Sequence, residues 1–267
     1  MNTHQDDFLP ATLDPPGTIA VLGTTPIGIE AALYGRYLGY NVTLLAAADL
    51  WKQPTVREGM PPRIGPTFHD DWFAQHWLGE KSIDERWTDG LPMLPDRSLS
   101  PLAISAISAQ REDEPAALPV TMQQWIEDGL QQVIATDLLR GRVHSNTFVD
   151  AIALAPVVDE EGDAEASEGE DDSEEDIPPD FLLSLSGEPI ESAENGQLRA
   201  ECVIVADLPS DFCRRDFDLP ADYFFHLRMP NQVDAADALR PGWQQIAEVF
   251  AGLAGRPDLD LYRPQRV

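Results

Sequence analysis

The chain has 267 residues, of which 43% are hydrophobic, so its length and composition allow one large domain with a substantial core. It carries 18 basic and 47 acidic residues, a formal net charge of −29, which argues against nucleic acid or an anionic membrane surface as a partner. No apolar run is long enough to cross a bilayer, and the polar, acidic start does not resemble a signal sequence. We therefore expect a cytoplasmic protein with a disordered tail over residues 1–17 and a single domain over residues 18–267.

The first elements after the tail predict a complete βαβ unit. Residues 18–22 form a short apolar run typical of a strand buried in a parallel sheet, and Gly23 follows it directly. Pro26 can open a helix with a broad apolar face, Gly39 can end that helix, and residues 41–45 can return as a second strand. This order predicts an α/β fold built on a Rossmann-like parallel sheet with flanking helices.

The turn of this unit resembles the opening of the two-dinucleotide-binding flavoproteins, the superfamily of pyridine nucleotide-disulfide oxidoreductases and flavin monooxygenases. Their usual turn is G-x-G-P-x-G, and this chain has G-T-T-P-I-G. The resemblance implies an FAD- or NAD(P)-binding fold and an oxidoreductase-like protein, with the cofactor diphosphate beside the turn. The residues that it implies there are Gly23, Thr24, Thr25, Pro26, Ile27 and Gly28.

Three positions depart from that pattern. Thr25 replaces the second glycine, which would place a branched side chain where the backbone approaches the diphosphate. Ala46 stands where the family has a ribose-binding carboxylate, and the nearest acid is Asp49. Asp207 follows the last sheet strand where the family has a small neutral turn, so we expect a buried carboxylate that would repel an anionic cofactor. We therefore expect a degenerate site at which FAD or NAD(P) binds weakly or not at all.

Residues 51–117 predict an irregular insertion rich in Pro and Trp. Within it, Ser100 and Pro101 are typical of the N-cap and first position of a helix over residues 102–110. His69 and His76 flank two aspartates, but their spacing is not that of a helical histidine pair, and we predict no metal site.

Further elements are expected in the second half of the chain. Thr121 and Gln124 have capping-box spacing, which predicts a helix over residues 122–134. The run 143–154 can supply a third sheet strand and then the first arm of a hairpin, and residues 181–186 are its second arm. Residues 198–206 become strongly apolar towards their end, as expected for a strand that leaves a small antiparallel meander and enters the parallel sheet beside residues 18–22. A last amphipathic helix is expected over residues 241–255.

The hairpin is interrupted by residues 159–176, which contain twelve acidic and no basic residues. Charges of one sign at this density repel, so we expect a disordered loop that serves solubility or docks a basic protein partner.

Catalytic residues cannot be assigned. Cys202 and Cys213 do not form a redox pair, and no catalytic triad or Walker loop is present. Two hypotheses remain open: an oxidoreductase-like protein with a degraded dinucleotide site, or a non-catalytic interaction or regulatory protein that retains the flavoprotein fold.

Overall fold

A computed structural model describes residues 12–46, 98–111, 118–119, 124–156, 178–208, 211–228 and 239–263 of the chain. The predicted acidic loop 159–176 lies outside the described residues, and so do residues 51–97 and 112–117 of the insertion predicted over residues 51–117.

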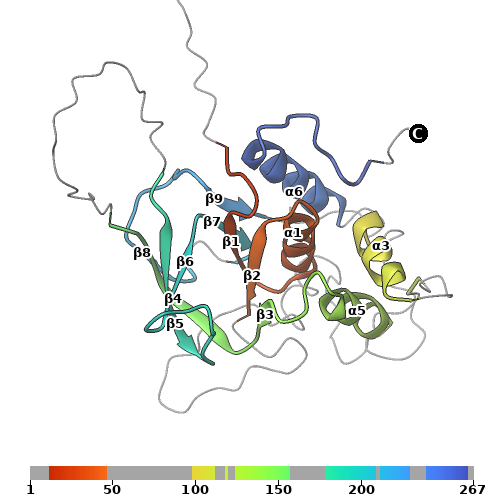
Figure 1. Ribbon diagram of the computed structural model, residues 1–267, viewed down its shortest axis with the longest axis horizontal. Coiled ribbons are helices and arrows are strands. Elements are labelled where there is room, and N and C mark those ends of the chain that lie inside the picture. Colours follow the sequence, from red (N-terminus) through yellow and green to blue (C-terminus); the bar gives the residue numbers. More distant parts are fainter. Residues whose placement is uncertain are drawn as a thin grey trace, which may run out of the picture.

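A parallel sheet forms the centre of the fold (Figure 1). Its strands are β1 (Thr18–Leu22), β2 (Asn41–Leu45), β3 (Val143–His144), β7 (Cys202–Ala206) and β9 (Phe224–Leu227). Their order is β3-β2-β1-β7-β9, and every adjacent pair is parallel. The predicted Rossmann-like sheet, with β1 between β2 and β7, is therefore confirmed. The edge strand β9 is an addition that the sequence did not predict.

A second, smaller sheet carries the meander. Strands β4 (Thr147–Leu154), β5 (Phe181–Gly187) and β6 (Gln197–Ala200) pair antiparallel in this order, as predicted. Strand β8 (Arg214–Arg215) adds to the free side of β4 in parallel, which the sequence did not predict.

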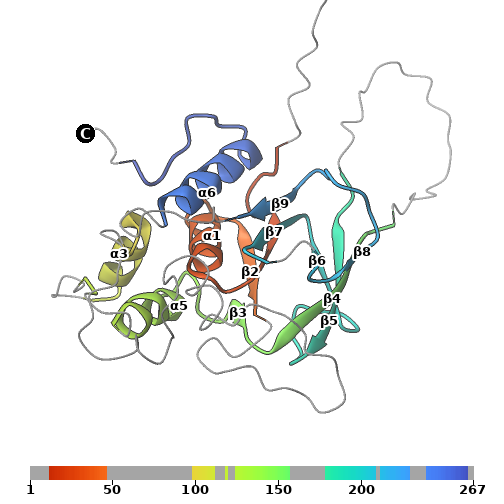
Figure 2. The ribbon, with the colours of Figure 1, turned by 180° about the vertical axis from the view of Figure 1, so that it is seen from behind.

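The helices gather on one face of the parallel sheet and the meander lies on the other (Figures 1 and 2). The helices are α1 (Pro26–Tyr37), α3 (Pro101–Ala109), the π-helix η3 (Trp125–Leu130), α5 (Gln131–Ala135) and α6 (Arg240–Leu253). In α3, the Ser100 hydroxyl accepts a hydrogen bond from the Ala103 N–H at 2.9 Å, which confirms the predicted N-cap.

The helix predicted over residues 122–134 is present over residues 124–135, but part of it has π-helical winding. The chain makes a π-helical segment followed by the short α5, and residues 120–123 lie outside the described part. Gly129 is buried in that segment, and a Cβ on it would lie 3.2 Å from side-chain atoms of Leu99 and Trp125. Close packing against a neighbouring segment, which helical periodicity cannot reveal, accompanies the change in winding.

Alternation along the buried strands divides the hydrophobic core in two. Ile19, Val21 and Ile204 belong to the core beneath the helices. Ala20 and Val203 belong to the core shared with the meander. Since successive side chains of a strand point to opposite faces, strands covered on both faces must be apolar throughout, which is why β1 and β7 read as unbroken apolar runs.

Part of the expected N-terminal tail packs on the domain. Leu13 is buried, its N–H donates to the Leu253 carbonyl at 2.8 Å, and its own carbonyl accepts from the Tyr40 hydroxyl at 2.8 Å. The disordered tail predicted over residues 1–17 therefore does not extend through residues 12–17.

Among the described residues, no helix combines the length and apolar character that a membrane span would need.

Candidate functional site

The glycine turn that follows β1 is held against the end of β7. Gly23 has φ +104°, and a Cβ there would lie 2.5 Å from the Ala206 carbonyl oxygen. A Cβ on Gly28 would lie only 1.9 Å from the Gly23 carbonyl oxygen and 3.2 Å from the Ala206 Cβ. Both glycines are thus required by contacts within the chain itself.

Thr25 closes the start of helix α1. It is the N-cap residue, and its hydroxyl oxygen accepts a hydrogen bond from the Gly28 N–H at 3.2 Å. Pro26, at the first helical position, has no N–H to offer. All six residues from Gly23 to Gly28 are buried, and Thr25 is only 1% exposed. The helix N-terminus, where an anion would ordinarily bind, is therefore capped from within the chain.

Ala46 follows β2 at the same edge of the sheet. It is buried, its N–H donates to the His144 carbonyl at 2.9 Å, and its carbonyl accepts from the Thr147 N–H at 2.9 Å. This backbone links β2 to β3 and β4, and it leaves a buried methyl group where the resemblance places a ribose-binding carboxylate. Asp49, the alternative acid, lies outside the described residues.

Asp207 follows β7 and is half-buried, so the expectation of a buried carboxylate is wrong. Its φ is +57°, and its N–H donates to the Leu227 carbonyl at 2.9 Å. Aspartate is one of the few residues other than glycine that adopt this backbone region readily. Because β1, β2 and β7 are parallel neighbours, the structure brings Gly23, Ala46 and Asp207 to one edge of the sheet.

Glu30 is a site residue that the sequence analysis missed. It lies on α1 among apolar neighbours, is 6% exposed, and its Oε1 has no hydrogen-bond partner within the described part of the chain. Burial raises the pKa of this carboxyl to about 7, although the Ser100 and Tyr262 hydroxyls each lower it. The sequence signal was that Glu30 is the single acid of this helix and stands within the apolar run 26–35.

A pocket opens beside Glu30 between α1, α3, α5 and the start of α6. Its empty space, including the solvent-open mouth, is about 260 Å³. Polar atoms come from Glu30, Ser98 and Ser100, and the remaining walls are mainly apolar. The apolar walls include Ile29, Leu99, Leu130, Val133, Leu239 and Trp243.

The C-terminal segment covers Glu30 from one side. The Tyr262 ring stacks on Trp243 at 5.7 Å between centroids and lies tilted on Tyr34 at 5.3 Å. The Leu261 N–H donates to the Tyr34 hydroxyl at 3.0 Å. Burial, followed by the nearby Glu30 carboxyl, raises the pKa of Tyr262 well above its ordinary value. Tyr262 thus lies next to Glu30. The buried hydroxyl oxygen of Tyr262 nevertheless makes no well-aligned hydrogen bond to any described residue.

The two thiols and the other ionisable groups of the described residues form no activated nucleophile or metal centre. Burial raises the pKa of the Cys202 thiol well above its ordinary value and that of Cys213 to about 11, so neither thiol is primed as a thiolate. In the described ranges, no three His, Cys, Asp or Glu side chains gather where they could hold a metal ion. His69 and His76 lie outside those ranges.

No protein-family model matches the sequence, and no curated protein sequence matches it. Comparison with solved structures finds distant similarities. An oxidized steroid monooxygenase bound to NADP is 14% identical, with 73% of this chain and 26% of the other covered and a TM-score of 0.35. The FAD-bound form 1 of OTEMO is 12% identical, with 74% and 26% covered and a TM-score of 0.35. S-allyl-L-cysteine S-oxygenase from Allium sativum is 13% identical, with 71% and 36% covered and a TM-score of 0.35. The chain thus spans between about a quarter and somewhat over a third of the length of these proteins.

Proposed function

We propose that this chain is a flavoprotein-like Rossmann protein that retains the fold, has a degraded dinucleotide site, and acts as a non-catalytic interaction or regulatory protein. One observation carries the proposal. The two motif glycines that the chain keeps, Gly23 and Gly28, are demanded by its own packing, whereas the glycine that a ligand would demand has become Thr25. Survival of the glycine turn is therefore explained without a cofactor.

The chemistry of the turn supports weak binding of FAD or NAD(P). A diphosphate that used the Gly28 N–H would have to displace the Thr25 hydroxyl, and an N-cap of this kind is worth about 1 kcal/mol. A missing charge-assisted hydrogen bond at Ala46 removes about 1.5–3 kcal/mol, or roughly ten- to a hundredfold in affinity. Asp207 adds a negative charge at the same edge. These residues do not fit a tightly held dinucleotide.

The competing proposal is a flavin- or nicotinamide-dependent oxidoreductase that binds the cofactor diphosphate at the glycine turn. What favours it is the location of the turn: it lies at the carboxyl edge of the parallel sheet, between β1 and the start of α1, where open α/β sheets bind nucleotides. The location of the turn is a property of the fold, and a fold by itself does not establish an activity.

Calorimetry with FAD, NAD and NADP separates the two proposals. We expect no micromolar binding by the unmodified protein, a gain of affinity in Thr25→Gly, and no gain in the matched control Thr25→Ser, which keeps the capping hydroxyl. The double variant Thr25→Gly with Ala46→Glu tests whether a ribose contact can be restored, with circular dichroism to verify that the buried Ala46 position tolerates the change. Micromolar binding by the unmodified protein would refute the degraded site.

We also propose that the acidic segment 159–176 docks a basic protein partner. Its twelve acids and lack of basic residues support this proposal. Titration with a lysine-rich peptide tests it. Binding should be salt-dependent and should disappear when residues 159–176 are deleted, and a deletion variant that binds equally well would contradict the assignment.

A further inference from the structure

The Glu30 pocket has a chemistry of its own, apart from the glycine turn. Glu30 is more than nine-tenths buried and lines the pocket, and its Oε1 accepts no hydrogen bond from the described residues. A buried acceptor that lacks a donor lowers the stability of the folded protein, so a ligand that donates to it gains binding free energy. An incoming ligand with an N–H group would meet it.

From this arrangement we propose that the pocket binds the protonated head group of a small primary amine. An ammonium group offers three donors and no acceptor, which matches a carboxylate flanked by the side chains of Ser98 and Ser100. The Ser100 hydroxyl oxygen already accepts one hydrogen bond, from the Ala103 N–H, and it could accept one more from an ammonium group.

The size and walls of the pocket select among cations. Most of the 260 Å³ is narrow or open to solvent, and the remaining space suits one water-sized head group, which a primary ammonium matches and a guanidinium or a trimethylammonium exceeds. An apolar body attached to the amine would extend into the solvent-open part of the pocket, whose lining is mainly apolar. The indole of Trp243 provides an aromatic wall that attracts cations.

The charge state of Glu30 gives the proposal a signature. The groups that face the carboxyl are the Ser100 and Tyr262 hydroxyls. Tyr34 and Asp260 lie near Tyr262 and raise its pKa electrostatically. Since the pKa of the unliganded Glu30 is about 7, an amine must displace a proton from it in mildly acidic solution. Amine affinity should therefore fall about ten- to thirtyfold between pH 7.5 and pH 5.5, with proton release to the buffer at the lower pH.

The test uses the full chain and calorimetry with propylamine and benzylamine. Propanol and benzyl alcohol serve as neutral controls of similar shape, and benzyltrimethylammonium as a cation with a large head group. We expect saturable binding of the two primary amines only, at least tenfold weakening in Glu30→Gln, and loss of binding in Ala103→Leu, which fills the pocket. The matched control Glu248→Gln removes an exposed acid of α6 and should bind normally.

Two results would overturn the site. Equal losses in Glu30→Gln and Glu248→Gln would mean that amines are attracted only by the acidic surface. Absence of saturable amine binding in a protein that is folded by circular dichroism would refute it outright. Neither result depends on whether a dinucleotide binds, so the amine site and the proposed function can fail separately.

Discussion

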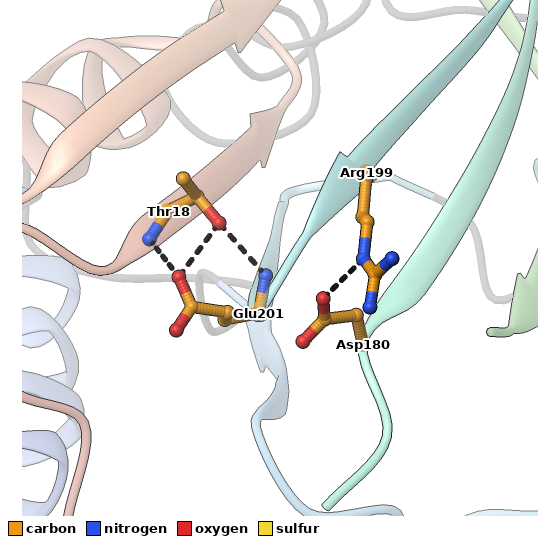
Figure 3. Close-up of polar contacts among 4 residues, drawn as sticks. All are labelled: Thr18, Asp180, Arg199 and Glu201. Carbon is orange, nitrogen blue, oxygen red and sulfur yellow. Dashed lines mark hydrogen bonds and ion pairs between the residues drawn. The ribbon is translucent and has the colours of Figure 1, made fainter. Parts of the chain in front are cut away.

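Thr18 and Glu201, which are 183 positions apart, tie the first strand of the parallel sheet to the residue that directly precedes β7 (Figure 3). The Glu201 Oε2 accepts hydrogen bonds from the Thr18 N–H at 2.6 Å and from its hydroxyl at 2.9 Å, and the Glu201 N–H donates to that hydroxyl at 3.1 Å. These bonds fix the start of β1 at the point where the chain passes from the meander into β7. The contact thus joins the parallel sheet to the residue that links β6 to β7.

Removal of this carboxylate should loosen the junction between the sheets. We expect Glu201→Ala to lower the free energy of unfolding by about 1–2 kcal/mol, because hydrogen bonds to a charged group are worth about 1.5–3 kcal/mol and this one is half-buried. Figure 3 also shows the control, the ion pair of Asp180 with Arg199, whose side chain is 67% exposed. Asp180→Ala should lower the free energy of unfolding by no more than about 1 kcal/mol. Urea titration of both variants measures the difference. Equal costs would mean that the Thr18 contact has no special role.

The glycine turn should tolerate no side chain at Gly28. Gly28→Ala would place a methyl group 1.9 Å from the Gly23 carbonyl oxygen, so the backbone must move, at a cost of about 3 kcal/mol or more. Gly252→Ala in α6 is the matched control, because nothing lies within 4 Å of its Cβ. That variant should gain about 0.5–1 kcal/mol from helix propensity. Thermal unfolding of both variants measures the contrast, and a tolerated alanine at residue 28 would show that the turn is looser than described.

Glu30 should make the stability of the protein depend on pH in an unusual direction. In the unfolded chain this carboxyl loses its proton near pH 4.5, and in the folded protein near pH 7. As the pH rises through this window, Glu30 ionises first in the unfolded state. The contribution of Glu30 to the free energy of unfolding therefore falls by roughly 3 kcal/mol and stays low above pH 7. Glu30→Gln should lack this fall and be more stable than the parent at pH 8. Urea midpoints of both proteins at pH 5 and pH 8 test this, and parallel pH profiles would contradict it.

The acidic segment 159–176 should be dispensable for folding. Strands β4 and β5, which precede and follow it, are paired at Leu154 and Phe181, so a short turn can join them. Since the rest of the chain is also acidic, deletion should relieve repulsion and leave stability equal or slightly higher. Denaturant unfolding of the deletion variant is the measurement, and loss of a cooperative transition would show that the segment has a structural role.

Local pattern was sufficient for the central part of the fold. Propensity and periodicity predicted the βαβ unit directly, because its elements follow one another within residues 18–45. They are β1, the glycine turn, the helix that begins at Pro26, and β2. The same holds for the capped start of α3, where the hydroxyl of Ser100 lies three residues from its partner N–H.

Contacts between distant segments decided the rest. Strand β9 is four residues long and exists because its backbone pairs with β7, which no pattern within β9 encodes. The motif around Gly23 and Gly28 suggested a ligand, but only the approach of Ala206 shows that the chain itself requires both glycines. The sequence showed Glu30 only as an acid among apolar neighbours, and its burial beside Ser100 and Tyr262 made it a candidate site residue. The sequence alone determined which segments form strands and helices, because those preferences act over a few residues. The tertiary structure decided which polar groups lose water, because desolvation depends on what the rest of the chain places around them.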